Sequence, residues 1–356
     1  MGLSACPEIG ARRFRALLSA FGSASAVWSA SEAQLRAQAG LSASVATKLV
    51  QHCRHTDPAA LFAQIRTQGI GLCFPEDAHY PAALNTLHDP PFLLYWRGSP
   101  QAWERFGRAL ALVGTRQPTP AGLEIARSLA RELSYQGVTS VSGLASGIDT
   151  AVHQGALEAG GCTVAVLGMG LNHIPRAKSH LAAEIETQGL LISEYPPAFS
   201  GTKWSFPLRN RIISGLSGGV CVIEAAPGSG ALITADCALE QGREVMALPG
   251  LVSAPQSAGP HALIQQGAAL VTCVSDMLEV MGWEPSQAQA LPSPSDDNVL
   301  TNPENEVYLI LNEIPRSLES LTHQLNWPVS QTLTLLTQLE LGGRVRQWPG
   351  SRYSRI

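Results

Sequence analysis

The stretch "ALALVGTRQPTPAGLEIARSLARELSYQGVTSVSG", residues 109–143, decides the fold. An apolar run occupies 109–113, apolar residues at helical spacing occupy 120–137, and a second apolar run begins at 138. Strand, helix and strand in this order are typical of a βαβ unit, in which the two strands lie parallel. The stretch therefore predicts an α/β fold with a parallel sheet.

The same alternation continues to residue 272. Further short apolar runs rich in Val, Leu and Ala follow, most of them with a helical pattern behind: "CTVAVLG" (162–168), "LLISEY" (190–195), "GVCVIEA" (219–225), "EVMALPG" (244–250) and "AALVT" (268–272). An earlier run, "FLLYW" (92–96), is also a candidate strand. Strands that alternate with helices predict a sheet covered by helices on both faces. The order of the strands does not follow from the sequence.

The segments on either side of residues 69–283 have a different character. Residues 1–68 read as short helices, in which "PEIGA" and "AGLSA" each place a Gly-containing hairpin before a helix. This pattern predicts an all-α, SAM- or helix-hairpin-helix-like domain, used either to bind DNA phosphates or only for packing. Residues 284–303 are rich in Pro, Ser, Gln and Asp and predict a flexible linker. Residues 304–356 read as three helices and a hairpin, the order of a winged-helix domain.

Composition excludes several classes of protein. The formal net charge is −4, so no overall basic field indicates a nucleic-acid partner. The seven cysteines show no C-x-x-C spacing, as expected of reduced thiols in a cytoplasmic protein, and no long apolar run predicts a membrane span. A P-loop motif is missing, and "GMGLNH" lacks the third glycine of a dinucleotide-binding loop. We therefore expect no cofactor and no membrane partner.

Ligands of an open parallel sheet bind beyond the carboxyl ends of its strands. Small, hydroxyl and basic residues follow the predicted strands there: Gly114, Thr115 and Arg116; Ser142 and Gly143; Gly168 and Gly170; and Ser229, Gly230 and Thr234. Glycines and hydroxyls that open helices on one edge expose backbone N–H groups, which suit phosphate. The pattern predicts an anion site along this edge.

The segment "KWSFPLRNRIISGLS", residues 203–217, adds charge and aromatic surface to this edge. Arg209 and Arg211 converge only if they lie at the start of a helix, where a phosphate between them would favour both. Lys203, Trp204 and Phe206 supply another cation and rings for stacking, as in single-strand binding grooves. The alternative is an ion pair with Glu194 or Glu224, and we expect one arginine to pair and the other to bind phosphate.

Two further titratable residues, Asp149 and His153, show no pattern of a metal site or a catalytic site. Asp149 and His153 lie four residues apart on a predicted helix, but no further ligands accompany them. We expect a helix cap and a packing residue, and neither a metal site nor a catalytic group.

Five motifs together resemble the DNA-processing protein A (DprA/Smf) family: "VGTR" (113–116), "SGLASGIDTAVHQGAL" (142–157), "FPLRNRIISGLS" (206–217), "VIEAAPGSGALITADCALEQGREVMALPG" (222–250) and "GPHALIQQGA" (259–268). The resemblance covers most of residues 70–283. It implies an extended Rossmann-like, doubly wound and mostly parallel sheet. Asn172 and Ala231 depart from the family's usual motifs.

The resemblance also implies a function. A homodimer without catalytic activity would bind single-stranded DNA regardless of sequence, protect it, displace single-strand binding protein and load the RecA recombinase during natural transformation. The implied DNA pocket contains Arg116, Lys203, Phe206, Arg209, Asn210 and Arg211, lined by the loops around Ser142–Gly143, Gly168–Gly170 and Ser229–Gly230.

Two other functions compete with this one. "PGSGALITA" is similar to the phosphate loop of nucleotide monophosphate phosphoribohydrolases, although Glu224 precedes the loop instead of following it. A sequence-specific regulator would rest on the winged helix alone. The last helix of that domain, 330–343, carries no Arg or Lys to read base edges.

Overall fold

The computed structural model describes residues 1–286, 302–311 and 315–355. The chain divides into two compact units, Met1–Leu291 and Pro292–Ile356, and each is described by itself. Most of the predicted linker, 284–303, lies outside the described residues. Within the described part, no helix is both long and apolar enough to cross a membrane.

The first unit contains a nine-stranded sheet with the order β1-β2-β6-β5-β4-β3-β7-β8-β9. Strands β3 to β9 run parallel, whereas β2 pairs antiparallel with both β1 and β6. The strands are β1 (Gly71–Cys73), β2 (Leu94–Gly98), β3 (Ala109–Val113), β4 (Thr139–Ser142), β5 (Thr163–Leu167), β6 (Leu190–Ser193), β7 (Gly219–Val222), β8 (Glu244–Ala247) and β9 (Ala269–Leu270). All the apolar runs predicted as strands are strands, and only the short β1 was missed.

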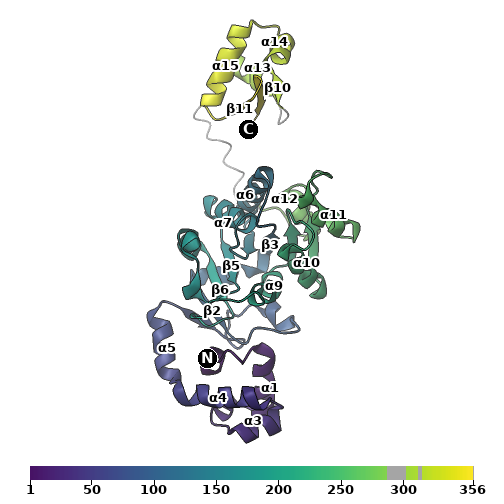
Figure 1. Ribbon diagram of the computed structural model, residues 1–356. Helices are drawn as coiled ribbons and strands as arrows, with labels where there is room; N and C mark the ends of the chain where they lie inside the picture. The colour runs from purple at the N-terminus through teal and green to yellow at the C-terminus, as the bar shows by residue number, and fades with distance from the viewer. Residues whose placement is uncertain (287–301, 312–314, 356) are drawn as a thin grey trace. The chain divides into compact units, whose positions relative to one another are not determined.

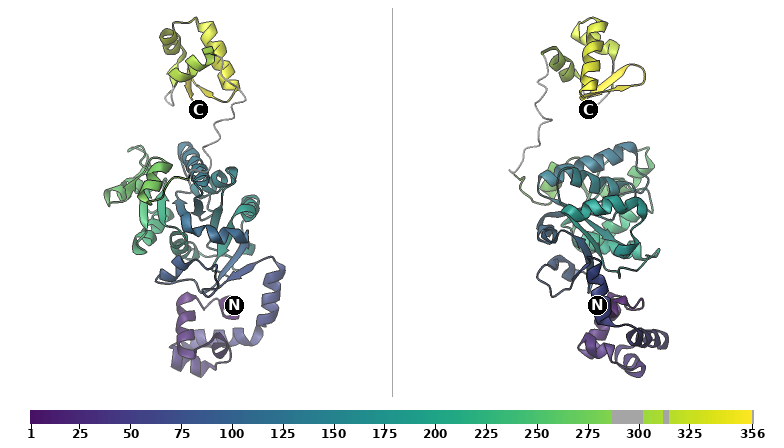
Figure 2. Two further views of the ribbon diagram at one scale, coloured as in Figure 1. Left: turned by 180° about the vertical axis from the view of Figure 1, so that it is seen from behind. Right: turned by 90° about the vertical axis from the view of Figure 1, so that its left-hand side faces the viewer.

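Helices cover both faces of this sheet (Figures 1 and 2), as predicted. Side chains alternate along β3: Ala111 and Val113 belong to the core on one face, and Leu110 and Leu112 to the core on the other. The first face is covered by α9 (Ser205–Gly215), α10 (Gly230–Glu240) and α11 (Ala258–Gln265). The second is covered by α6 (Pro120–Tyr135), α7 (Ile148–Glu158), α8 (Ser179–Gln188) and α12 (Val274–Val280). The architecture is the predicted doubly wound one.

The strand order reverses between β3 and β7, and this reversal positions the site. From β3 the chain adds β4, β5 and β6 on one side, then crosses back to place β7 on the other side. Val113 lies opposite Val222 in the register, so both strands end at the same level. The loops after β3 and β7 therefore diverge to opposite faces of the sheet and leave a crevice between them.

The N-terminal residues form helices that share one apolar core (Figure 1). They are η1 (Gly2–Ala5), α1 (Ala11–Phe21), α2 (Ala24–Trp28), α3 (Glu32–Ala39), α4 (Ala43–His55) and α5 (Pro58–Thr67). Leu17 and Leu49 are fully buried in that core. Contacts with the sheet region include a 2.5 Å hydrogen bond between the Ser4 and Tyr95 hydroxyls and a stack of Phe14 on Phe92 at 3.9 Å between ring centroids.

The second unit has three helices and a small sheet of order β10-β12-β11. Its elements are α13 (Asn302–Ile310), β10 (Arg316–Ser317), α14 (Leu318–Leu325), α15 (Val329–Leu341), β11 (Val345–Trp348) and β12 (Arg352–Arg355). Buried Leu321, Leu336 and Tyr353 join helices and hairpin in one core. This is the predicted order of three helices and a hairpin, with β10 as an extra short strand.

Candidate nucleic-acid interface

A cavity of about 810 Å³ lies at the carboxyl edge of the sheet, at the reversal between β3 and β7. The loop after β3, the loop after β4, the start of α9 and the loop before α10 each contribute to its wall. Eight of the residues predicted for the site line it: Arg116, Lys203, Phe206, Arg209, Asn210, Ser229, Gly230 and Thr234. The structure thus brings together residues that are more than a hundred positions apart.

Arg209 forms the floor of this cavity and is only 5% exposed. Its guanidinium donates to the carbonyl oxygens of Val166 and of Gly143, the latter at 2.9 Å. Burial lowers the pKa of Arg209 to about 10, and the neighbouring Asp149 counteracts that effect. Arg209 therefore stays charged at neutral pH and contributes a fixed positive charge beneath the cavity.

Arg116 and Lys203 supply mobile positive charge at the rim. Both side chains are exposed and line the cavity, and neither forms a hydrogen bond or ion pair within the described residues. Gly230 and Ala231 add the N-terminus of α10, where Ser229 caps the helix by accepting a bond from the Ala231 N–H at 3.4 Å. Free cations beside a helix N-terminus favour a phosphate group.

Aromatic side chains lie beside these charges. Phe206 is half-buried in the cavity wall, and Gly168 lets it approach, because a Cβ at that position would lie 2.7 Å from the Phe206 Cδ1. Trp204, next to Lys203, is 78% exposed. A tryptophan left that open to water offers a flat apolar surface on which a base can stack.

Four predicted site residues support the cavity from below and do not line it. The buried Ser142 hydroxyl donates to the Leu112 carbonyl at 2.8 Å, and Gly143 accepts from Arg209. Gly168 packs under Phe206 and accepts a bond from the Ser205 hydroxyl at 2.6 Å. Gly170 donates to the Phe199 carbonyl at 2.7 Å. Because the parallel strands end in tight turns, these four residues make hydrogen bonds and packing contacts within the protein and are not exposed to a ligand in the cavity.

Arg211 does not converge with Arg209, contrary to the prediction. Its guanidinium bonds both oxygens of Glu194, at 3.1 and 2.7 Å, and lies 3.8 Å from Asp89. It lines a separate cavity of about 410 Å³. The reason is helical geometry: α9 already begins at Ser205, so residues 209 and 211 lie on different sides of the helix. We expected one arginine to form an ion pair and the other to bind phosphate. Arg211 does form the ion pair, with Glu194, whereas the guanidinium of Arg209 is buried against backbone carbonyls.

Asn210 holds two elements of the wall together. Its side-chain amide donates to the Gly230 carbonyl at 3.0 Å, and its carbonyl oxygen accepts from the Arg209 Nε at 3.3 Å. The first bond ties α9 to the start of α10. Asn210 is therefore a positioning residue that also lines the cavity.

Asp149 lies at the cavity floor beside Arg209, although the sequence suggested only a helix cap. Its carboxylate accepts bonds from the N–H groups of Gly143 and Ala145 at 3.2 and 3.3 Å, which orders the loop before α7. Burial raises the pKa of Asp149, and Arg209 opposes that shift. The available signal was that the loop between β4 and α7 ends at Gly147, which places Asp149 in the first turn of the helix that follows a strand end.

His153 is the packing residue that the sequence predicted. It is fully buried, and its Nδ1 lies 2.8 Å from the Thr163 hydroxyl, which itself donates to the Ser140 carbonyl. Because that hydroxyl proton is used, Nδ1 carries the proton and donates to Thr163. Burial lowers the pKa of His153 to about 3, so the ring is neutral.

Glu224 is fully engaged in capping. One carboxylate oxygen accepts from the Thr119 N–H at 2.9 Å and the other from its hydroxyl at 2.6 Å, at the start of α6. The side chain does not appear among those that line the cavity. Glu224, already misplaced in sequence for the phosphoribohydrolase alternative, therefore has a structural role at the start of α6.

Two family models match the chain: DNA recombination-mediator protein A over residues 71–282, and the DprA winged helix domain over residues 284–351. The chain belongs to the DNA recombination-mediator protein A family. Membership of this family makes it a DNA-processing recombination mediator, as the five sequence motifs suggested. The second match confirms the predicted winged helix.

Relatives of this family agree over most of the chain. Protein Smf of Escherichia coli (strain K12) is 41% identical over 289 residues, which are 79% of this chain and 76% of that protein. DNA processing protein DprA of Bacillus subtilis (strain 168) is 43% identical over 220 residues, 62% of this chain and 74% of that protein.

Two solved structures share the fold. The X-ray structure of DNA processing protein A from Streptococcus pneumoniae superimposes with a TM-score of 0.67 at 34% identity, over 78% of this chain and 94% of that one. A structure that describes the single-stranded DNA binding mode of the Helicobacter pylori protein gives a TM-score of 0.53 at 30% identity. It covers 59% of this chain and 95% of that one.

Proposed function

We propose that this protein binds single-stranded DNA, regardless of sequence, in the cavity at the carboxyl edge of the sheet. One observation carries the proposal: Arg116 and Lys203, two exposed cations without an ion-pair partner in the described part of the chain, line the same cavity as a helix N-terminus and the half-buried ring of Phe206. Phosphates would lie on the cations and on the start of α10, with bases against Phe206 and Trp204. The Helicobacter pylori relative, described as binding single-stranded DNA, supports the same ligand class here.

The chemistry of the cavity favours binding over catalysis. Asp149, which lines the cavity, accepts bonds from the N–H groups of Gly143 and Ala145, and Glu224, which does not line it, accepts both its bonds from Thr119. The two exposed cations that line it, Arg116 and Lys203, suit phosphate. We infer a mediator without enzymatic activity that acts in the cytoplasm.

Binding to an oligonucleotide of defined length tests this proposal. The Arg116→Ala/Lys203→Ala double variant removes two phosphate contacts, so the slope of log K against log salt should fall by about 1.4. Fluorescence anisotropy with labelled single strands, repeated over a salt series, measures this slope. Arg105→Ala serves as a control, because Arg105 is exposed just before β3, at the opposite edge of the sheet. A double variant with the wild-type slope would contradict the proposed site.

The cellular role follows from binding without sequence preference. We infer that the protein, as a homodimer, protects incoming single strands in natural transformation, displaces single-strand binding protein and loads RecA. The ATPase activity of RecA on strands coated with single-strand binding protein should rise when the protein is added. The same assay with the double variant separates a loading role from a direct effect on RecA.

A further inference from the structure

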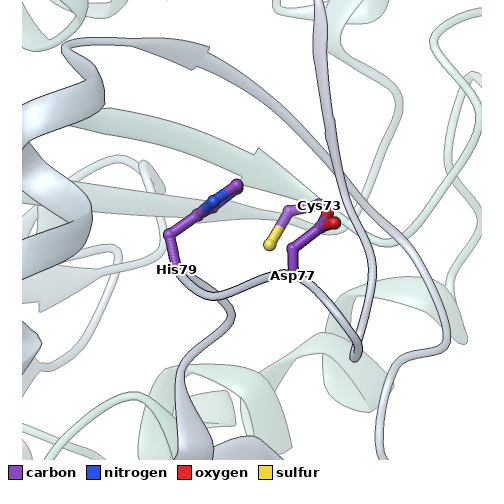
Figure 3. A group of neighbouring side chains, drawn as sticks. All are labelled: Cys73, Asp77 and His79. Carbon is purple, nitrogen blue, oxygen red and sulfur yellow. The ribbon is translucent and has the colours of Figure 1, made fainter.

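A cluster of three side chains lies at the end of β1, in a loop that the DNA site does not use. The Cys73 Sγ, a carboxylate oxygen of Asp77 and a ring nitrogen of His79 all lie within 4.8 Å of one another. Figure 3 shows the three side chains gathered where strand β1 passes into the following loop. Cys73 is buried, Asp77 is half-buried and His79 is exposed, so the cluster leads from the core to solvent.

The loop holds this cluster in place without help from a ligand. The Phe74 N–H donates to the Asp77 Oδ2 at 2.8 Å, and the Asp77 N–H donates to the Phe74 carbonyl at 3.0 Å. The Tyr80 N–H then closes the turn on the Asp77 carbonyl at 2.9 Å. One carboxylate oxygen is thus bound and orients the other, which is how outer hydrogen bonds position metal ligands.

His79 is also oriented, although it is exposed. Its ring lies against Trp103, with 5.4 Å between the ring centroids. Neither ring nitrogen forms a hydrogen bond with another described residue, so each remains available as a ligand. Cys73 is likewise fixed, because β1 pairs it with Leu94 of β2.

We propose that Cys73, Asp77 and His79 form a binding site for a single Zn²⁺ ion. A thiolate, an imidazole and a carboxylate are the three ligand types that zinc takes, and magnesium or calcium would select oxygen ligands only. Three protein ligands leave the fourth tetrahedral position to water, which the exposed side of the cluster can supply. Zinc would draw these ligand atoms, which lie within 4.8 Å of one another, to its usual bond lengths of about 2.0–2.3 Å.

Binding requires the thiol proton to leave. Burial, with a smaller contribution from Asp77, raises the pKa of Cys73 to about 12, so the free protein holds a neutral thiol. On binding, the S–H bond breaks, an S–Zn bond forms and the proton passes to solvent, with no change in oxidation state. The ion replaces the proton, and its positive charge compensates for the cost of a buried thiolate.

The ion would stabilise a connection that reaches α9. The loop leads into η2 (Ala82–Thr86), and the side chains of Leu84 and Leu87 pack directly on Gly215 of α9. Fixing the loop by a metal therefore stabilises the folded state around α9 but adds no group to the DNA cavity. The proposal is independent of the proposed function.

Cobalt(II) titration of the full reduced chain tests the site, because Co²⁺ replaces Zn²⁺ and reports its ligands by colour. We expect one equivalent to give a thiolate-to-cobalt band and the visible bands of tetrahedral cobalt, both lost when Zn²⁺ is added. Cys73→Ser should abolish the thiolate band. His79→Gln should weaken binding by about tenfold or more while leaving the fold intact, because the residue is exposed.

Cys273→Ser provides the matched control, since Cys273 is the exposed thiol of the chain and would carry adventitious binding. Zn²⁺ should also raise the melting temperature of the wild type and of Cys273→Ser, and should raise that of His79→Gln less at the same concentration. The proposal is overturned if wild type and His79→Gln bind cobalt with equal affinity. A thiolate band that survives in Cys73→Ser and disappears in Cys273→Ser overturns it too.

Discussion

Arg209 and Arg211 are the same residue type two positions apart, yet their surroundings give them different roles. Arg209 is buried on backbone carbonyls beside Asp149, and Arg211 bonds Glu194. Neither is a free phosphate ligand of the kind that Arg116 and Lys203 represent. We therefore expect substitution of Arg209 or Arg211 to change the stability of the protein as well as its DNA site.

Arg209→Ala should lower the free energy of unfolding by about 1–3 kcal/mol, because it leaves the buried carbonyl oxygens of Gly143 and Val166 without a donor and removes the positive charge near Asp149. Arg209→Lys should cost less, since it retains the charge while losing the second donor direction. Urea unfolding followed by tryptophan fluorescence measures both values, and Arg105→Ala is expected to stay within about 0.5 kcal/mol of wild type. An Arg209→Ala protein as stable as the wild type would show that the buried guanidinium contributes little.

At the scale of elements, the site depends on how closely the start of α9 approaches the loop after β5. Ser205 donates to the Gly168 carbonyl at 2.6 Å, and Phe206 lies directly over that glycine. Helix α9 begins at Ser205, so Phe206 lies in its first turn. The absence of a side chain at 168 lets the two elements touch.

Gly168→Ala should push the start of α9 away from β5, because the new Cβ would lie 2.7 Å from Cδ1 and 2.9 Å from Cα of Phe206. The second contact is with backbone, so rotation of the ring alone cannot relieve it. We expect a loss of about 1–3 kcal/mol in stability and weaker binding of single strands. Gly107→Ala, where a Cβ meets nothing within 4 Å, should change neither quantity in parallel unfolding and anisotropy measurements.

At the scale of the whole molecule, the buried neutral His153 makes folding sensitive to acid. Its pKa is about 3 in the folded chain against an ordinary value of 6.5, so the unfolded chain binds the extra proton between these values. The stabilising effect is complete above pH 6.5 and is lost as the pH falls toward 3. The first unit is therefore expected to be least stable in acid.

His153→Gln removes this titration, which makes the difference between variant and wild type a direct measure of it. Below pH 6.5 the stability advantage of the wild type should shrink by about 1.4 kcal/mol for each pH unit. Chemical unfolding at several pH values between 7 and 5 provides the comparison. The titration of the carboxylates contributes equally to variant and wild type and cancels in the difference. If the difference in unfolding free energy between wild type and variant does not change with pH, His153 is not the group that makes the fold sensitive to acid.

The sequence by itself determined the local features, because these depend on periodicity and on the residues beside each strand. Alternating apolar runs and helical patterns predicted the parallel sheet covered on both faces, and the order of three helices and a hairpin predicted the winged helix. The rule that ligands meet strand ends found Arg116, Lys203, Phe206 and Ser229, which do line one cavity. Each of these predictions needs only the chain direction and neighbours close in sequence.

Tertiary structure alone decided the strand order, the burial of Arg209 and the pairing of Arg211 with Glu194. Glycines after parallel strands look alike in sequence, yet those at 143, 168 and 170 support the cavity and Gly230 opens onto it. The convergence of Cys73, Asp77 and His79 likewise depends on the turn that Asp77 closes. Whether a residue is buried, paired or exposed depends on which side chains lose contact with water when distant elements pack together. The neighbouring residues in the sequence do not determine this.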